Sequence, residues 1–410
     1  MKINYCSKCL NPSNHPLGII FDKNGICSGC NVHDEKYKID WDKKLEKLGN
    51  FFHSKKNKNN YYDCIIPVVG NGDDFFVTHI AKNILKINPL LVSYNTGFNT
   101  KVGIRNLARL ISRLDCDHFQ ITTNPKIVKK ISSETFKKTG DFYWHILAGN
   151  QAFPVQVAVK MKIPVILWGV NGWLDQVGKF SHHHEVEMTK KVWEEFSLRN
   201  LSTKQLIGKN INYKDIAPYV YPSLSEIKKN GVRGIYLGNY LLWDAKKQTE
   251  DMIKLYDYET LNQQRTHNTY ESIYCKNNAG VHDYIKFLKF GYGKVTDHIN
   301  RDIRFKRITR DEGKIIISKY ERKIPKDLNY FFKWININKN NFYKRFTKNS
   351  FEYSESKYNK LSFNKDEFKK IERKLNYIVT KNLEKESLED EYIVFGRTYM
   401  DEGNYKAIEG

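Results

Sequence analysis

The chain has 410 residues, of which 40% are hydrophobic and 14% aromatic, so it is long enough to fold into two or three domains with sizeable cores. It contains no run of about 18 apolar residues, and its first residues lack the apolar core of a signal peptide, which excludes a membrane-spanning helix and predicts a soluble protein of the cytoplasm. The formal net charge of +22 predicts a polyanionic partner, such as a nucleic acid, a nucleotide, a phosphorylated sugar or an acidic protein; a solvated basic surface is the alternative.

Two C-x-x-C pairs, separated by 17 residues, lie near the start of the chain: Cys6, Cys9, Cys27 and Cys30. This spacing places four thiolates on two tight turns, as a tetrahedral Zn²⁺ ion requires. Disulfides are the alternative, but a cytoplasmic protein would not keep them. We therefore predict a zinc ribbon at 1–35, whose closed shell of four cysteines serves folding or docking rather than catalysis. The Lys- and Asn-rich residues 36–62 predict a linker with a short amphipathic segment at 41–48.

The stretch 63–74 predicts a buried parallel strand that turns tightly into the N-terminus of a helix. Such a corner presents backbone N–H groups to an anion, and the helix dipole favours negative charge there. A plain turn with acidic partners of the helix dipole is the alternative. The residues of the corner are Gly70, Asn71, Gly72, Asp73 and Asp74.

Strands and helices then alternate along the chain. The patterns predict further strands at 90–94, 117–121, 164–169 and 231–240, and helices at 101–114, 125–138 and 151–162. Alternation of this kind predicts a parallel sheet that is covered on both faces and binds ligands at the carboxyl ends of its strands. We place this α/β domain at 63–245.

The remainder of the chain, 246–410, is predicted to be mostly helical and basic. Gly291 and Gly293 interrupt a helical pattern and leave Lys289, Lys294 and His298 close together in the sequence. A basic cluster of this kind suits an anionic substrate, and the alternative is that the three side chains pair with acidic neighbours on the surface.

These motifs together resemble the N-acetyl sugar amidotransferases of the PP-loop ATPase superfamily, which act in the biosynthesis of O-antigen and of nonulosonic acids of the pseudaminic or legionaminic type. The resemblance covers most of the chain. Besides the C-x-x-C pairs and the glycine corner, it rests on FPVQVAVK at 153–160, ILWG at 166–169, HDY at 282–284, KFGYGK at 289–294 and DIR at 302–304.

The resemblance implies a PP-loop (adenine nucleotide alpha hydrolase-like) domain between a zinc ribbon and a helical C-terminal region. It also implies ATP-dependent conversion of an acetamido group into an acetamidino group, on a nucleotide- or lipid-linked sugar. AMP would be attached to the amide oxygen with release of pyrophosphate, and ammonia would then displace the AMP. The implied cofactors are ATP, Mg²⁺ and structural zinc, and the implied partners are a glutaminase and a cyclase-like protein that supply ammonia.

The resemblance also implies roles for individual residues. Gly70, Asn71, Gly72 and Asp73 would hold the pyrophosphate, and Ser93 and Tyr94 would lie beside the adenine. The catalytic candidates, for general acid work or for contact with the substrate phosphate, are Asp73, Lys289, Lys294 and His298.

The chain departs from the family pattern at the expected mouth of the sheet. Where the family has Ser-Gly-Gly-Lys-Asp-Ser, residues 69–74 read VGNGDD, so both hydroxyls and the lysine are replaced. Asp74 puts a carboxylate where the family has a hydroxyl that faces phosphate. At about 4 Å and an effective dielectric constant of about 20, this repulsion is roughly 4 kcal/mol, unless Mg²⁺ lies between the charges. Family members tend to carry cysteines and a histidine before Ala-Gly, whereas in residues 143–149 only Trp144, Ala148 and Gly149 hold this pattern, and Val170 replaces an acidic residue.

These departures leave two alternatives to an active amidotransferase. One is a catalytically impaired family member that binds a sugar nucleotide or a protein partner. The other is a tRNA-modifying PP-loop enzyme, which would explain zinc and basic charge together, although no RNA-binding module is apparent in the sequence.

Overall fold

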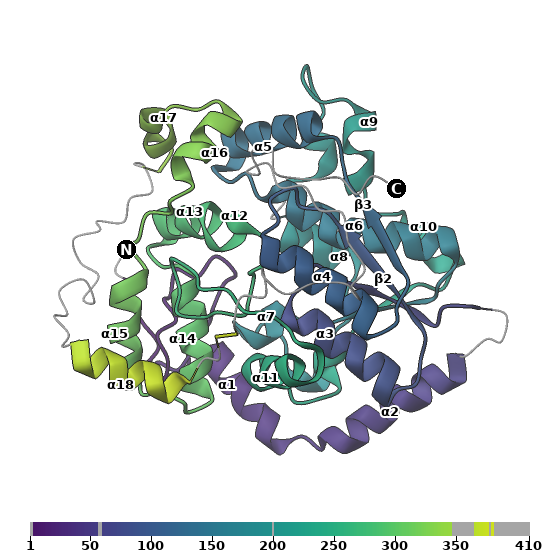
Figure 1. The fold of residues 1–410 in the computed structure, drawn as a ribbon, viewed down its shortest axis with the longest axis horizontal. Helices are drawn as coiled ribbons and strands as arrows, with labels where there is room; N and C mark the ends of the chain where they lie inside the picture. Colours follow the sequence, from purple (N-terminus) through teal and green to yellow (C-terminus); the bar gives the residue numbers. More distant parts are fainter. Residues whose placement is uncertain (1–2, 56–59, 199–200, 347–364, 377–378, 381–410) are drawn as a thin grey trace.

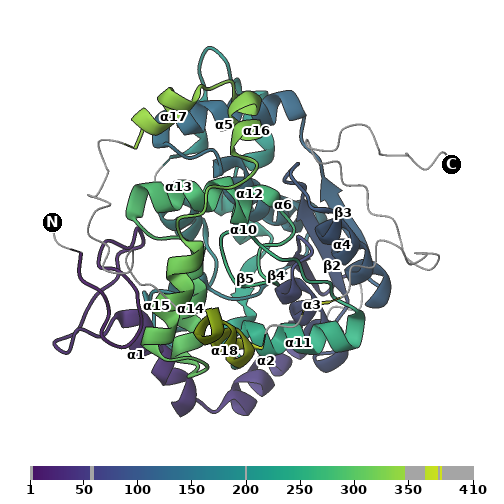
Figure 2. The ribbon, with the colours of Figure 1, turned by 60° about the vertical axis from the view of Figure 1, so that its left-hand side comes forward.

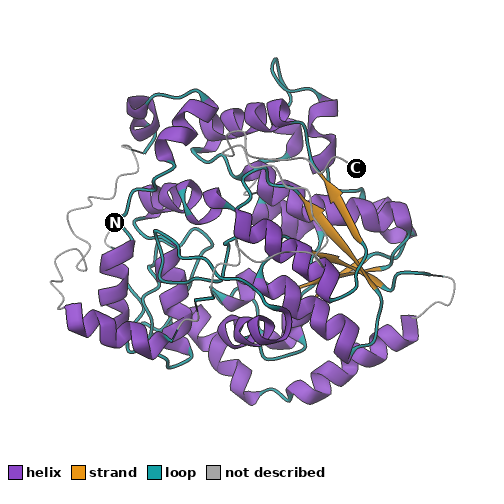
Figure 3. Ribbon diagram, in the orientation of Figure 1, coloured by secondary structure: helices purple, strands orange, loops and turns teal. Residues whose placement is uncertain are grey.

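The structure is a computed structural model, and it describes residues 3–55, 60–198, 201–346, 365–376 and 379–380. Five parallel strands form one sheet in the order β3-β2-β1-β4-β5. Helices surround the sheet on both faces (Figure 3), so the predicted α/β fold with a parallel sheet is confirmed. The strands are β1 (Cys64–Pro67), β2 (Pro89–Tyr94), β3 (His118–Ile121), β4 (Val165–Trp168) and β5 (Arg233–Tyr236).

The predicted helices of the α/β part are present, with one change of length. They are α3 (Gly72–His79), which continues into a π-helical turn at Ile80–Ile84, α4 (Lys101–Arg113), α5 (Pro125–Thr139) and α6 (Trp144–Met161). Helix α6 begins at Trp144, whereas the pattern predicts a start at Gln151. This helix packs against β1, β2 and β4, and its first turns are buried on several sides, so they show no alternation of polar and apolar residues.

Helices also make up most of the rest of the described chain (Figure 1). They are α1 (Ser28–Glu35), α2 (Trp41–Lys55), α7 (Gly172–Asp175), α8 (Lys190–Val192), α9 (Tyr213–Ile216), α10 (Leu224–Lys229), α11 (Ala245–Tyr256), α12 (Lys276–Ala279), α13 (Val281–Phe290), α14 (Lys294–Arg304), α15 (Arg310–Tyr320), α16 (Leu328–Ile335), α17 (Lys339–Lys344) and α18 (Lys365–Leu375). Helix α2 lies in the predicted linker, and its Leu48 and Phe52 are buried in the core.

The two faces of the sheet face different cores, because side chains alternate along each strand. Ile66 of β1 packs with residues of α2, α3, α4 and α11, whereas its neighbour Ile65 packs with residues of α6. An aromatic core joins α5 to α13, α16 and α17. A fourth core joins the N-terminal cysteines to α14, α15 and α18 (Figure 2), so the two ends of the described chain meet on one side of the sheet.

A buried ion cluster fixes the loop after α11 to helix α4. The carboxylate of Glu259 accepts hydrogen bonds from Arg105 (Nε 2.8 Å, Nη2 2.7 Å) and from Arg109 Nη1. Burial on its own would raise the pKa of Glu259, but the two guanidinium groups hold it below its usual value. The side-chain oxygen of Asn106 accepts a hydrogen bond from the backbone N–H of Glu259 (2.9 Å), so the backbone of this loop is held as well.

We predict that Glu259→Gln lowers the free energy of unfolding by about 3 kcal/mol at pH 7, because it removes the buried carboxylate that pairs with Arg105 and Arg109. The measurement is urea unfolding followed by circular dichroism. The pKa of Glu259 is lower in the folded than in the unfolded protein. Its contribution to the free energy of unfolding is therefore fully present above the pKa of the unfolded state and is lost as the pH falls through the pKa of the folded state.

Asp257→Asn is the matched control, because Asp257 pairs with Arg113 at 3.6 Å on the surface. Its backbone has φ +56°, which asparagine also adopts, so we expect a change of less than about 0.5 kcal/mol. Equal effects of the two substitutions would show that the buried cluster contributes no more than a surface pair.

Candidate functional site

The strand order defines where a ligand can enter. The chain runs from β1 outward to β2 and β3, and then returns to the other side of β1 for β4 and β5. In open parallel sheets, ligands bind at such a switch point, in the crevice beyond the carboxyl ends of the two strands. Here this crevice lies beyond β1 and β4, next to the glycine corner that follows β1 and next to Gly169 and Val170.

The glycine corner has the shape of an anion-binding nest. Gly70 has φ +90°, and a Cβ atom there would lie 2.7 Å from the carbonyl oxygen of Gly103, so glycine is required. Helix α3 begins at Gly72, which packs against Thr249. The N–H groups before the helix therefore converge on one point, as they do in phosphate-binding loops.

A side chain from the first turn of α3 already occupies this nest. Oδ2 of Asp74 accepts hydrogen bonds from the backbone N–H groups of Val69 (2.7 Å), Gly70 (2.8 Å) and Asn71 (2.9 Å). A phosphate oxygen would need the same three donors, so the corner as folded does not fit a triphosphate. Mg²⁺ could offset the repulsion between Asp74 and a phosphate only if the Asp74 carboxylate faced the phosphate. In the structure this carboxylate faces the backbone N–H groups.

Two adjacent carboxyl groups of the corner have unusual proton affinities. Burial raises the pKa of Asp74 to about 6, and its three backbone hydrogen bonds keep it from rising further. Burial, together with the charges of Glu271 and Asp74, raises the pKa of Asp73 to about 8. Asp73 therefore holds a proton at neutral pH, while Asp74 carries the charge that fills the nest.

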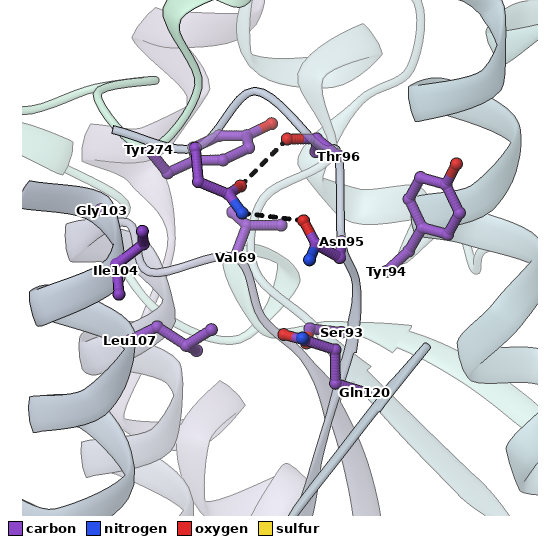
Figure 4. Close-up of a pocket in the computed structure, with 11 residues that line it drawn as sticks. Val69, Ser93, Tyr94, Asn95, Thr96, Gly103, Ile104, Leu107, Gln120 and Tyr274 are labelled. Atoms are coloured by element: carbon purple, nitrogen blue, oxygen red, sulfur yellow. Dashed lines mark hydrogen bonds between the residues drawn. The ribbon is translucent and has the colours of Figure 1, made fainter. Parts of the chain in front are cut away.

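The predicted adenine position is a small pocket of about 20 Å³, which has room for water but not for a purine ring (Figure 4). Ser93 faces it and hydrogen-bonds to His118 (2.8 Å) and Gln120 (3.1 Å). The Tyr94 side chain points away from the pocket and bonds through its hydroxyl to His145 (3.0 Å) and Tyr219 (2.9 Å). Both side chains that were predicted to flank adenine are thus engaged with the protein.

A larger cleft lies beside the corner and has two lobes. The polar lobe has a volume of about 380 Å³ and the apolar lobe about 320 Å³. They adjoin, because both are lined by Leu17, Leu147, Gln151 and Gln176. Leu17 comes from the loop between the cysteine pairs and Leu147 from α6, so the cleft lies where the N-terminal region meets the sheet.

The polar lobe contains the basic groups of α13 and α14. Lys294 Nζ donates to Ser272 Oγ (2.9 Å) and to Asn278 Oδ1, and burial lowers its pKa to about 8. Lys286 pairs with Asp297 at 2.5 Å. Lys294 therefore carries its positive charge at neutral pH and faces the cleft.

The apolar lobe is lined by aromatic side chains at the ends of β4 and β5. Trp173 packs on Phe196 with ring centroids 4.7 Å apart, and Trp168 and Tyr236 line the same lobe. A pocket with apolar walls and a few polar groups at one end is the usual form of a small-molecule site.

The predicted basic cluster is divided among three places. Gly291 ends α13 with φ +79° and α14 begins at Lys294, so the predicted interruption of the helix is present. Lys294 lines the polar lobe, but Lys289 bonds to the carbonyl of Thr139 (2.6 Å) outside it. His298 lines neither lobe, is hydrogen-bonded to Thr266 (2.7 Å) and is kept neutral by burial, which lowers its pKa. The sequence spacing therefore brings only one of the three side chains to the cleft.

The four predicted cysteine ligands meet at one point. Their Sγ atoms lie within 4.8 Å of one another, as four ligands of one tetrahedral ion would, so the cluster could hold zinc and would leave no position open for catalysis. Helix α14 docks on this cluster. Asn300 accepts from the N–H of Leu10 (2.7 Å), and Arg304 Nη2 lies 3.7 Å from Cys27 Sγ.

Some residues of the site were not found from the sequence. Asn150, Gln151 and Gln176 line the cleft, yet isolated amides carry no motif. The position of Asp74 did carry a signal, because an acidic residue at the third position of a helix commonly reaches back to the backbone before it. The alternative of a helix with acidic capping partners was thus closer to the observed contact than the phosphate site.

Comparisons with known proteins give one family match and two partial relatives. Residues 264–375 match the family model "LPS biosynthesis protein WbpG-like, C-terminal domain". An uncharacterized protein of Methanocaldococcus jannaschii is 24% identical over 112 residues, which are 27% of this chain and 40% of that protein. The NH₃-dependent NAD synthetase from Campylobacter jejuni, solved with a nitrate ion, is 18% identical with a TM-score of 0.26, over 35% of this chain and 63% of that one. The chain spans less than two thirds of either relative.

The matched region supplies part of the cleft. It contains Lys286, Lys294 and Asp297 of the polar lobe. In the part of the chain that the structure describes, no helix has the length and apolar character needed to cross a bilayer.

We predict that the purified protein contains one zinc ion per chain and that Cys27→Ser removes it and lowers the thermal midpoint by roughly 5 °C or more. The reason is that four thiolates and the docked helix α14 share one core. Zinc is measured by mass spectrometry and the midpoint by calorimetry. Cys116→Ser, which changes a buried cysteine outside the cluster, is expected to keep the metal. Zinc-free wild-type protein with the same midpoint would contradict the prediction.

Proposed function

We propose that the protein takes part in surface-polysaccharide biosynthesis by binding a phosphate-bearing acetamido sugar in the two-lobed cleft, and that ATP-dependent amidation is impaired in this chain. The observation that carries the second half of the proposal is the carboxylate of Asp74, which occupies all three N–H groups of the nest. The WbpG-like match at residues 264–375 supports the link to polysaccharide.

The cleft supports a sugar phosphate as ligand. A phosphate oxygen can take a charge-assisted hydrogen bond from Lys294, which faces the polar lobe and is charged at neutral pH. The aromatic walls around Trp168 and Trp173 offer apolar surface to the ring or its carrier. Binding in this cleft uses no group from the glycine corner, because none of residues 69–74 lines either lobe.

An active amidotransferase is the second candidate, and the shape of the corner favours it. The three N–H groups still converge as a nest, and burial raises the pKa of Asp74 to about 6, so its charged form is disfavoured by desolvation. ATP, Mg²⁺ and ammonia from a partner glutaminase and cyclase-like protein would then be required. In that case Asp74 leaves the nest when the nucleotide binds.

We predict that N-acetylglucosamine 1-phosphate binds the wild-type protein and that Lys294→Met weakens this binding by at least about tenfold, because a charged donor to phosphate is lost. The dissociation constant is measured by NMR titration. Lys289→Met is the matched control, since Lys289 lies on the preceding helix and bonds to Thr139 outside the cleft. Equal weakening by both variants, or no effect of Lys294→Met, would place the phosphate elsewhere.

We predict that Asp74→Ser binds ATP with Mg²⁺ at least about tenfold more tightly than the wild-type protein does. The substitution frees three N–H groups and removes a repulsion of roughly 4 kcal/mol. Isothermal titration calorimetry measures the affinity. Asp73→Ser serves as the control, because it leaves the carboxylate of Asp74 in the nest.

The same proteins separate the two candidate functions. Wild-type protein is expected to release no pyrophosphate from ATP in the presence of ammonia and UDP-N-acetylglucosamine or N-acetylglucosamine 1-phosphate. Pyrophosphate release that depends on the acetamido sugar would overturn the impaired form of the proposal and establish the amidotransferase.

A further inference from the structure

Three side-chain amides line the cleft where its two lobes join. Gln151 and Gln176 line both lobes, and Asn150 lines the polar one. All three residues are half-buried. Oδ1 of Asn150 and Oε1 of Gln151 are buried without a hydrogen-bond partner among the described residues. Buried polar groups are nearly always paired with protein or with ordered water, so these two acceptors are available to a hydrogen-bond donor that enters the cleft.

The amides are carried by backbone that is firmly held. Asn150 and Gln151 lie within α6. Pro154 of the same helix has no N–H group, so the carbonyl of Asn150 also lacks its usual helical donor. The carbonyl of Gln176 accepts from Arg304 Nη2 at 2.9 Å, and its N–H donates to the carbonyl of Gly172 at 2.9 Å. Their side chains therefore start from fixed positions, which lowers the entropy lost on binding.

The charges of the polar lobe indicate what these amides can recognise. Lys286 and Lys294 line it together with Asp283 and Asp297, and Lys286 pairs with Asp297. Asp283 is itself neutralised by Arg265 at 2.7 Å. Lys294 can bind one phosphate group. The remaining binding energy of a ligand in this lobe would come mainly from hydrogen bonds between uncharged groups. A primary amide has both a donor and an acceptor, so its complement is another amide.

We propose that Gln151 and Gln176, with Asn150 beside them, form the recognition site for the acetamido group of the sugar. The acetamido N–H donates to a side-chain carbonyl, its C=O accepts from a side-chain NH₂, and its methyl group enters the apolar lobe. This inference rests on the proposed function and adds to it the residues that distinguish an acetamido sugar from a plain one. These residues determine specificity and take no part in bond making.

The probes are N-acetylglucosamine 1-phosphate and glucose 1-phosphate, which differ only at the acetamido position and carry the phosphate without nucleotide or lipid. Wild-type protein is expected to bind the first about tenfold more tightly than the second, measured by NMR titration. In Gln151→Leu and Gln176→Leu, the ratio is expected to fall towards one while the affinity for glucose 1-phosphate stays unchanged.

Two further variants complete the experiment. Gln151→Glu keeps the hydrogen-bond acceptor and the size of the side chain. It replaces Gln151→Leu in the comparison if the thermal midpoint of the leucine variant differs from that of the wild type. We expect it to keep part of the preference. Asn262→Leu changes an exposed amide that lines neither lobe, and it is expected to leave the ratio unaltered.

The outcomes separate this inference from the proposal on which it rests. If neither sugar phosphate binds to the wild-type protein, both are overturned. If N-acetylglucosamine 1-phosphate binds, but the glutamine variants keep the full preference over glucose 1-phosphate, only the recognition by the amides is overturned. A selective loss of the acetamido preference supports both.

Discussion

One carboxylate oxygen determines what the carboxyl edge of this sheet can do. The β1–α3 corner has the strand, the glycine with positive φ and the helix N-terminus that an anion requires, and the anion is Asp74 of the same loop. Because an internal carboxylate is present at a very high effective concentration, an external phosphate has to displace it from three short hydrogen bonds. The candidate site therefore lies beside the corner, in the cleft, instead of in the corner itself.

The cleft depends on contacts between segments that are far apart in the chain. Leu17 comes from the loop between the cysteine pairs, Gln151 from a helix that covers the sheet, and Lys294 from the C-terminal helices. The guanidinium of Arg304 lies between these parts, since it donates to the carbonyl of Gln176 and lies close to Cys27. Loss of the cysteine cluster would thus affect the position of a residue that lines both lobes.

The sequence predicted those features that follow from local pattern. The apolar run of β1, the helices after it and the interruption at Gly291 were foreseen, because each rests on neighbouring residues. The separation of Lys289, Lys294 and His298 was not foreseen. Lys289 lies on α13, while Lys294 and His298 lie on α14 and point to different sides of it, and distance along the sequence does not fix these directions. The first turns of α6 were missed because a helix that is buried on several sides has no polar face to mark it.

The occupied nest has a consequence for the behaviour of the loop. Loops that bind nucleotides are commonly ordered by their ligand, and their conformation follows its concentration. At residues 69–74 the donors have a permanent acceptor, so this corner is expected to keep one conformation whether nucleotide is abundant or scarce. A change in the ATP concentration would then not alter the conformation of this loop. The carboxyl edge of the sheet would stay rigid beside the neighbouring cleft.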